Sequence, residues 1–429
     1  MEKIVINGGQ PLYGDIEVSG AKNAAVAVVY ACLLVKEKIV LENIPPIVDV
    51  SVSLEILKSM GVKIKMLKKD VVEIDASEVQ QGSSPAELVR RMRASYYLIG
   101  AELGRFGKAS VDYPGGCDFG VRPIDQHIKA FTALGANVVV DNGRIEATTD
   151  KGMQGAEVFF DVVTVGATMN LMIAAACAEG TTVIENAARE PHVVDLANFL
   201  NSCGANIKGA GTGTIKINGV KELHGCTYAI IPDMIEAGTY MIAAAATGGK
   251  MKISNVIPKH LESVTAKLKE MGVAVSEGDD YIIVGAVPEL RRVNIRTLPY
   301  PGFPTDMQPQ MCVLLCLAKG VSLLNEGVWD SRFRYVEELK RMGANIKVDG
   351  KTAVVEGVES LSPAKVRAVD LRAGAAMIIA GLATAGKTEI EDIHFIERGY
   401  DNVVGKLAGV GASIKKVVVP DENVFDIAN

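Results

Sequence analysis

A short pattern repeats six times along the chain, and it constrains the fold more than any other feature. It recurs as LKSMGVKI, FTALGANV, FLNSCGANI, LKEMGVAV, LKRMGANI and, more loosely, KLAGVGASI, with its glycines at positions 61, 135, 204, 272, 343 and 411. Each copy predicts an amphipathic helix that ends at a Gly cap and is followed by a β-branched strand. The regular spacing of 68 to 74 residues indicates six copies of one supersecondary unit.

A second marker precedes each of these glycines. It consists of an Ala-rich helix, a tight turn and a strand, as in AEGTTVIENA and ATAGKTEIEDI. Two more strand-like stretches lie between one glycine and the next Ala-rich helix. The predicted unit is therefore strand, helix, strand, strand and helix in cyclic order, with helices packed on sheets. Six such units predict an α/β protein with two threefold domains.

Composition excludes several classes of protein. The chain has 429 residues, is 48% hydrophobic and carries a net charge of −6, so it can bury a sizeable core and is not disordered. General nucleic-acid binding is not expected, because that function needs a basic face for the phosphates. No signal peptide is expected at the N-terminus, and no apolar run reaches the ~20 residues of a membrane span. Seven cysteines without paired metal spacing are typical of a reduced, cytoplasmic protein.

Two glycine-rich segments resemble nucleotide-binding motifs. Residues 381–388 match the phosphate-loop pattern, but that motif follows a strand and opens a helix, whereas here the predicted order is reversed. The GAGTGT run at 209–214 precedes a predicted strand and is interpreted as a hairpin turn rather than a dinucleotide fingerprint. We therefore expect no cofactor.

Several polar residues lie outside the repeat pattern. Lys22 lies at the predicted start of the first Ala-rich helix, where free N–H groups and the helix dipole favour an anion; a solvated lysine is the alternative. Five arginines occupy different units, and each alone is compatible with a surface role. Their guanidinium groups could instead converge on phosphate and carboxylate oxygens. They are Arg93, Arg122, Arg332, Arg372 and Arg398.

Two further residues are candidates for proton transfer. Cys117 lies in PGGCDFG, a loop with one proline and three glycines, where an exposed thiol near cations could act as an acid or nucleophile, or have no role. Asp306 in FPTDMQ could cap the helix that follows or, if ringed by arginines, accept a proton from a hydroxyl. His127 is interpreted as part of a hydrogen-bonded loop. The five histidines show no ligand spacing, so a catalytic metal is not expected.

Together these motifs resemble the UDP-N-acetylglucosamine enolpyruvyl transferases over essentially the whole chain. The most specific match is PGGC followed by RPIDQH, because the related shikimate-pathway enolpyruvyl transferases are not expected to carry that cysteine loop. The matching segments are GAKNA at 20–24, RRMRAS at 90–95, PGGC at 114–117, RPIDQH at 122–127, TVGAT at 164–168, ENAAREP at 185–191, FPTDMQ at 303–308, SRF at 331–333, DLRA at 370–373 and RGY at 398–400.

The resemblance implies a fold and a domain division. The fold would be an inside-out α/β barrel of two similar domains, each with three repeated units of sheet and helix. One domain would span residues 22–231 and carry the Cys117 loop and much of the UDP-sugar site. The other would combine residues 1–21 with 232–429. The active site would lie in the cleft between them and close when substrate binds.

The resemblance also implies the reaction and its residues. The enolpyruvyl group of phosphoenolpyruvate would pass to the 3-hydroxyl of UDP-N-acetylglucosamine with release of phosphate, without a metal or cofactor. Cys117 would act as general acid and Asp306 as base. Lys22, Arg122 and Arg398 would hold the phosphate and carboxylate, with Arg332 and Arg372 supporting them or Asp306. Asp370 would orient the closed site or the surroundings of Cys117. The UDP-sugar site would include Asn23, Arg93, Arg122, Pro123, Ile124, Asp125, Gln126, Thr164, Val165, Gly166, Asp306 and Val328.

Some positions depart from the family pattern. A basic residue often precedes the SVGAT motif, near the diphosphate, whereas this chain has Val162 and Val163. Thr164 replaces the usual serine and keeps the hydroxyl. The cysteine at 117 implies sensitivity to epoxide antibiotics such as fosfomycin. The alternatives are an enolpyruvyl transferase that acts on shikimate 3-phosphate and a non-catalytic paralogue that binds a UDP-sugar.

Overall fold

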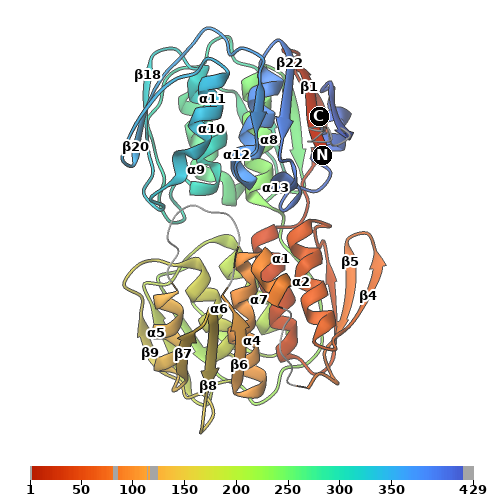
Figure 1. Cartoon of the computed structure of the whole chain (residues 1–429), viewed down its shortest axis with the longest axis vertical. Helices are drawn as coiled ribbons and strands as arrows, with labels where there is room; N and C mark the ends of the chain where they lie inside the picture. Colours follow the sequence, from red (N-terminus) through yellow and green to blue (C-terminus); the bar gives the residue numbers. More distant parts are fainter. Residues whose placement is uncertain (1, 81–85, 114, 116–123, 419–429) are drawn as a thin grey trace, which may run out of the picture. The chain divides into compact units, whose positions relative to one another are not determined.

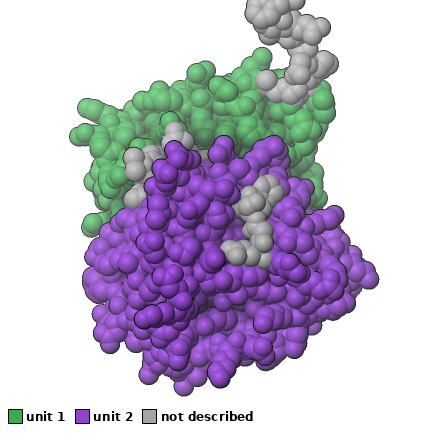
Figure 2. All heavy atoms as spheres, turned by 60° about the horizontal axis from the view of Figure 1, so that its bottom comes forward, with its two compact units in different colours: residues 1–18, 234–298, 302–429 green, residues 19–233, 299–301 purple. Residues whose placement is uncertain are grey.

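A computed structural model describes residues 2–80, 86–113, 115 and 124–418. The chain forms two compact units, coloured separately in Figure 2. Unit 1 contains residues 1–18, 234–298 and 302–429, and unit 2 contains residues 19–233 and 299–301. Each unit has a hydrophobic core of its own.

Unit 2 is built around three buried helices, α1, α4 and α6, of which α4 contacts both of the others. Their surfaces are apolar nearly all round, as expected for helices enclosed by other elements. Three further helices, α2, α5 and α7, are the ones that precede the repeat glycines, and α3 is a short additional helix. The bounds are α1 Lys22–Ala31, α2 Val48–Ser59, α3 Ala86–Arg91, α4 Tyr97–Phe106, α5 Asp125–Ala133, α6 Val165–Ala175 and α7 Pro191–Ser202.

Three sheets lie outside these helices in unit 2 (Figure 1). Their strand orders are β13-β3-β5-β4, β6-β8-β7 and β11-β12-β10-β9. Within the described residues the second sheet has three strands, whereas the other two have a fourth strand that pairs in parallel. The bounds are β3 Lys38–Glu42, β4 Lys63–Lys68, β5 Val71–Asp75, β6 Lys108–Asp112, β7 Asn137–Asp141, β8 Arg144–Thr148, β9 Glu157–Phe159, β10 Thr181–Glu185, β11 Asn206–Lys208, β12 Thr214–Asn218 and β13 Thr227–Ala229.

Unit 1 repeats this plan with α8, α10 and α12 as the buried, mutually contacting helices. The helices that precede the repeat glycines are α9, α11 and α14. The bounds are α8 Met234–Thr247, α9 Glu262–Glu270, α10 Gln308–Cys316, α11 Val336–Arg341, α12 Leu371–Ala383, α13 His394–Glu397 and α14 Val403–Gly409.

The three sheets of unit 1 are ordered β21-β22-β1-β23, β15-β16-β14-β2 and β17-β18-β20-β19. In the first of them, β1 pairs with β23, the last strand within the described residues. The bounds are β1 Glu2–Gly8, β2 Tyr13–Glu17, β14 Lys250–Ser254, β15 Val275–Glu277, β16 Tyr281–Val284, β17 Ile295–Arg296, β18 Val321–Asn325, β19 Asn345–Asp349, β20 Thr352–Glu356, β21 Lys365–Arg367, β22 Gly386–Glu391 and β23 Ile414–Val418.

The repeat glycines have the conformation that the sequence pattern predicts. All six have φ between 86° and 97°, a left-handed region that L side chains adopt at a cost. Each ends a helix and turns the chain toward a strand. The phosphate-loop lookalike at 381–388 joins the end of α12 to β22, which is the reverse of the nucleotide-binding order. GAGTGT connects β11 to the antiparallel β12, so the prediction of a hairpin is confirmed.

Candidate active site

Asp306 lies between two arginines in unit 1. It occupies a 3-10 turn, Thr305–Met307, that follows Pro304 and leads into α10. Arg332 Nη2 donates to Asp306 Oδ1 at 3.3 Å, and Arg372 donates to Oδ2 from Nε at 3.2 Å and from Nη2 at 3.1 Å. The two arginine side chains are 1% and 3% exposed, whereas that of Asp306 is 29% exposed. The guanidinium groups stabilise the ionised carboxylate and leave part of it accessible to a ligand.

Arg372 is fixed by its helix and by an aromatic ring. Asp370 caps α12, because its Oδ1 accepts from the backbone N–H groups of Arg372 at 2.8 Å and of Ala373 at 2.9 Å. The Arg372 guanidinium lies 5.5 Å from the centre of the Tyr400 ring, close enough for a cation–π interaction. The Tyr400 hydroxyl is in turn 2.9 Å from Thr239 Oγ1. The position of Arg372 is therefore determined from several sides, and Asp370 acts here as a helix cap.

Glu326 connects the Asp306 turn to Val328. Its Oε2 accepts from the hydroxyl of Thr305 at 3.1 Å, and its Oε1 accepts from the backbone N–H groups of Val328 at 2.9 Å and Trp329 at 3.1 Å. The residue is 1% exposed. A buried carboxylate with three donors fixes the loop geometry on both sides of the candidate base. Sequence reasoning missed Glu326, because a single acid between two apolar stretches carries no motif.

The other two predicted residues of unit 1, Arg398 and Val328, are close in sequence to Tyr400 and Glu326. Arg398 is half-buried and directly follows α13, two residues before Tyr400. Val328 is 36% exposed at the loop that Glu326 holds. The structure thus brings Asp306, Arg332 and Arg372 into direct contact.

In unit 2, Lys22 begins α1 and contacts two carboxylates. Its Nζ is 2.9 Å from Asp49 Oδ2, with the two side chains 12% and 5% exposed. Its backbone N–H donates to Asp233 Oδ2 at 3.0 Å. In this structure the chain's own acids therefore contact the groups expected to face an anion. Neither aspartate was predicted, since both pairings join residues far apart in the sequence. Asn23, the next residue of α1, is half-buried.

A second group in unit 2 centres on Tyr96. The Arg93 guanidinium lies 5.8 Å from the centre of the Tyr96 ring, and the ring of His127 lies 4.6 Å away from it. Burial lowers the pKa of the Arg93 guanidinium from its ordinary value. A Cβ added to Gly166 would lie 2.5 Å from the Tyr96 hydroxyl, so a side chain at 166 has no room. Close packing thus explains why glycine occupies this position at the start of α6.

His127 is a buried, neutral imidazole. Its Nδ1 is 3.1 Å from Asn170 Nδ2, and because an amide nitrogen is a donor, Nδ1 accepts and the proton lies on Nε2. Burial lowers the pKa of His127 to about 3. The residue belongs to α5, so its assignment to a loop was wrong, although the expected hydrogen bonding is present.

Gln126 and Lys129 connect α5 to the segment that precedes α6. Gln126 Nε2 donates to Asp125 Oδ2 at 2.8 Å and to Asp161 Oδ2 at 3.0 Å. Lys129 Nζ donates to Asp161 Oδ1 at 2.8 Å. These bonds place a cation beside the residue that precedes Val162, which is itself 59% exposed. This chain has no basic residue at 162–163, but Lys129 on α5 places a positive charge next to that position.

The remaining predicted residues of unit 2 lie at helix starts. Thr164 caps α6, and its side chain accepts from the N–H of Ala167 at 3.4 Å. Val165 is half-buried in the first turn of that helix, and Ile124 is buried directly before α5. Cys117, Arg122 and Pro123 lie outside the described residues.

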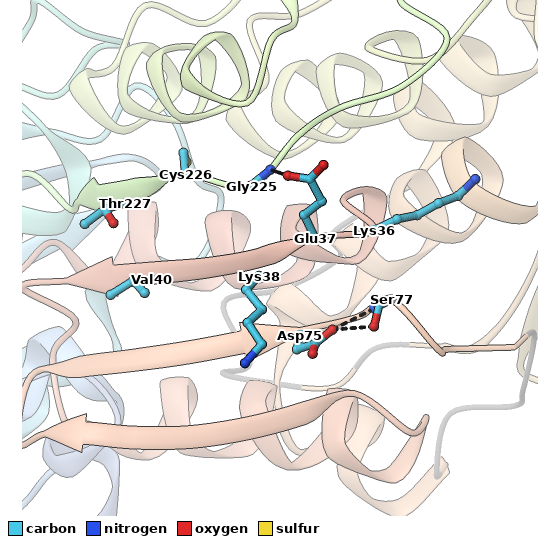
Figure 3. A pocket seen from close by; sticks show the side chains of 9 residues that line it. All are labelled: Lys36, Glu37, Lys38, Val40, Asp75, Ser77, Gly225, Cys226 and Thr227. Carbon is cyan, nitrogen blue, oxygen red and sulfur yellow. Dashed lines mark hydrogen bonds between the residues drawn. The ribbon is translucent and has the colours of Figure 1, made fainter.

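The described residues include neither a candidate metal site nor a membrane-spanning helix. No set of three or more His, Cys, Asp or Glu side chains there is arranged to hold a metal ion. Over the same ranges, no helix has the length and hydropathy of a bilayer-crossing segment. A hollow of about 540 Å³ in unit 2 is lined by Lys36, Lys38, Asp75, Cys226 and their neighbours (Figure 3), and none of the predicted site residues contributes to it.

Comparison with known proteins identifies the family. The family model described as EPSP synthase (3-phosphoshikimate 1-carboxyvinyltransferase) matches residues 6–407. The chain belongs to this family. A relative from Clostridium acetobutylicum, named UDP-N-acetylglucosamine 1-carboxyvinyltransferase 2, is 57% identical over 417 residues, which are 97% of this chain and 99% of the relative.

Solved structures agree with this family assignment. The enolpyruvyl transferase NikO from Streptomyces tendae superimposes with a TM-score of 0.88 at 28% identity, covering 98% of this chain and 99% of that one. An EPSP synthase from Acinetobacter baumannii gives 0.76 at 18% identity, covering 97% and 100%, and shows the fold alone. The predicted enolpyruvyl transferase fold is confirmed.

Proposed function

We propose that the chain transfers the enolpyruvyl group of phosphoenolpyruvate to the 3-hydroxyl of UDP-N-acetylglucosamine and releases phosphate. The observation that carries this proposal is the Asp306 carboxylate, held ionised by Arg332 and Arg372 and still partly exposed. Near-full-length relatives named for this reaction, such as the Clostridium acetobutylicum protein, support the choice of acceptor. The product is the first committed precursor of peptidoglycan.

Asp306 serves as the base for the acceptor hydroxyl. An ionised carboxylate can accept the hydroxyl proton as the sugar oxygen begins its attack. Arg332 and Arg372 each hold one oxygen of the carboxylate, so its orientation is set before the acceptor binds. This positioning reduces the entropy that must be lost when the reacting groups meet.

Cys117 is assigned as the general acid, because the PGGC segment that contains it resembles the cysteine loop of the family. Protonation of the methylene carbon of phosphoenolpyruvate makes it a methyl group and leaves positive character at C2. The sugar oxygen then forms a bond to C2 and gives a tetrahedral intermediate. Loss of a methyl proton and of the phosphate group, with its C–O bond electrons, restores the alkene on the product.

Cations bind the charged groups of the two substrates. Lys22, Arg122 and Arg398 are assigned to the phosphate and carboxylate of phosphoenolpyruvate. Such charges stabilise the transferring group where negative charge accumulates. Lys22 exchanges its contact with Asp49 for the incoming anion. The UDP-sugar is assigned to Asn23, Arg93, Arg122, Pro123, Ile124, Asp125, Gln126, Thr164, Val165, Gly166, Asp306 and Val328.

The cytoplasm is the proposed location. Cys32, Cys177, Cys203, Cys226, Cys312 and Cys316 are all free thiols, which is typical of a reducing compartment.

Phosphate release tests the proposed function. The purified protein is incubated with phosphoenolpyruvate and either UDP-N-acetylglucosamine or shikimate 3-phosphate. We expect release only with the UDP-sugar, and a loss of release in Asp306→Ala. Release with shikimate 3-phosphate alone would establish the alternative enzyme. Binding of the UDP-sugar without any release would establish the non-catalytic paralogue.

A further inference from the structure

Two cysteine thiols of unit 2 lie in contact with each other. Cys203 Sγ is 3.4 Å from Cys226 Sγ. Cys203 directly follows α7, and Cys226 directly precedes β13. Neither residue belongs to the proposed active site. A separation of 3.4 Å is larger than the ~2.05 Å of a disulfide, but rotation of the two side chains can close the difference.

Only one of these two thiols is open to small molecules. Cys226 is half-buried and lines the hollow of about 540 Å³, together with Lys36, Glu37 and Thr227 (Figure 3). Cys203 is 0% exposed. A reagent at the surface therefore meets the partly exposed Cys226 first, whereas Cys203 is enclosed behind it.

The backbone around the pair is already connected by hydrogen bonds. His224 N–H donates to the carbonyl of Cys203 at 2.9 Å, and Gly225 N–H donates to Glu37 Oε2 at 2.9 Å. The Tyr228 hydroxyl donates to Asp195 Oδ1 at 2.6 Å, which joins β13 to α7. A covalent bond between the thiols would therefore connect two elements that are held together without it, and needs no large backbone movement.

We propose that Cys203 and Cys226 form a two-step modification site for low-molecular-weight disulfides. The thiolate of Cys226 attacks one sulfur of the disulfide RSSR, the S–S bond breaks, and one thiol RSH leaves with the proton. Cys203 then attacks the Cys226 sulfur of the mixed disulfide, and the second RSH leaves. The two cysteines lose two electrons and two protons in total, and RSSR is reduced to two RSH.

The pair has a matched control within the chain. Cys312 and Cys316 are one helical turn apart in α10, and both are 0% exposed. They are neighbouring thiols without access to solvent. Burial raises the pKa of Cys203 and of Cys226 above the ordinary thiol value. Since the thiolate is the attacking species, the exchange should accelerate as the pH rises.

A disulfide between Cys203 and Cys226 would also affect the segment that follows β13. β13 pairs in parallel with β3 and leads through Ile231 to Asp233, whose carboxylate accepts from the N–H of Lys22. A disulfide at the start of β13 would restrain the segment that holds the first residue of α1. Oxidation would thereby restrict the movement of the N-terminus of α1, where Lys22 is assigned to substrate binding.

Peptide mapping tests the proposal on the full chain. The native protein is incubated with oxidised glutathione, unreacted thiols are alkylated after denaturation, and each cysteine is scored by mass. We expect a Cys203–Cys226 cross-link, with Cys312 and Cys316 fully alkylated. A lasting glutathione adduct on Cys226 in the wild-type chain, or full alkylation of Cys203 and Cys226, would overturn the proposal.

Two variants separate the two steps. Cys203→Ala should retain the glutathione adduct on Cys226, because the resolving thiol is absent. Cys226→Ala should leave Cys203 fully alkylated, because the mixed disulfide that Cys203 would attack cannot form. An adduct on Cys203 in Cys226→Ala would contradict the order of attack. The second variant suffices if the first fails to fold, since Cys226 is only half-buried whereas Cys203 is 0% exposed.

Discussion

Arg372 donates two hydrogen bonds to a single oxygen of Asp306, at 3.2 and 3.1 Å, while Arg332 donates to the other oxygen at 3.3 Å. The carboxylate is thus oriented by buried cations whose own positions are fixed by packing. A carboxylate arranged in this way is preorganised to accept a proton from a hydroxyl.

Asp306→Asn should lower kcat by about 10²- to 10⁴-fold, the range for loss of a general base. The amide keeps the size of the side chain and cannot take up the hydroxyl proton. Steady-state phosphate release measures kcat and KM. Asp330→Asn is the control, because that exposed acid pairs only with Lys351 among the contacts described. A kcat for Asp306→Asn equal to that of the control would refute the assignment of the base.

Glu326→Gln should lower kcat more than it changes KM. The amide nitrogen would face a donor, either the Thr305 hydroxyl or the N–H groups of Val328 and Trp329. A buried donor left unpaired costs about 1–3 kcal/mol, so urea unfolding should show a loss of that size. Steady-state phosphate release measures kcat and KM for this variant. A selective loss of kcat identifies a positioning role, because a purely structural residue would not change kcat selectively.

Glu356→Gln provides the matched control for Glu326. Glu356 is exposed on β20 and accepts from Asn345 Nδ2 at 2.7 Å. It should retain both kcat and stability. Equal effects in the two variants would show that Glu326 has no particular connection to the Asp306 turn.

Gly166→Ala should destabilise the chain by about 1–3 kcal/mol, the usual cost of overpacking. The new Cβ would lie 2.5 Å from the Tyr96 hydroxyl. The double variant Gly166→Ala, Tyr96→Phe removes that hydroxyl and should recover part of the loss, since the ring carbon that carried the hydroxyl and His127 Nε2 still lie 3.0 and 3.2 Å from the new Cβ. Thermal unfolding of the wild type, the two single variants and the double variant measures the coupling, and independent, additive effects would contradict the predicted contact.

Glu102 should make the stability of the chain fall as the pH rises. It is 2% exposed, and burial raises its pKa to about 8, although the N–H of Ser110 donates to Oε2. Between about pH 4.3 and 8 the native state then binds a proton that the unfolded chain has released. The native state is favoured below this window, and the advantage is lost as the pH passes through it, at up to about 1.4 kcal/mol per pH unit.

Glu102→Gln should remove this dependence. The amide retains a neutral side chain of similar shape at every pH. Urea unfolding at pH 5, 6, 7 and 8 would then give a flatter stability profile than the wild-type chain. Parallel profiles for the two proteins would show that Glu102 is not the titrating group.

The sequence pattern predicted the fold because it is repeated. Gly61 and the five equivalent glycines carry the same backbone requirement, positive φ after a helix, and this local requirement is readable from residue type. The buried helices are readable for the same reason, since α6 and α12 are apolar nearly all round. Hairpins such as β11–β12 follow from glycine turns.

The contacts of the candidate site were less predictable. Asp306 and Arg372 are 66 residues apart, and their meeting depends on how α10 and α12 pack. Asp49 and Asp233 reach Lys22 in the same long-range way. Residue type indicated which side chains could do chemistry, but only tertiary packing determines which carboxylate each cation contacts. The assignments of Cys117, Arg122 and Pro123 fall outside the described residues and stay predictions.

The most direct measurement is the mass of the product formed when both acceptors compete. Phosphoenolpyruvate is supplied together with equal concentrations of UDP-N-acetylglucosamine and shikimate 3-phosphate, and the mixture is analysed by mass spectrometry. We predict that the UDP-sugar gains an enolpyruvyl group and that shikimate 3-phosphate is unchanged. An enolpyruvyl adduct on shikimate 3-phosphate, or two unchanged acceptors, would contradict the proposed function.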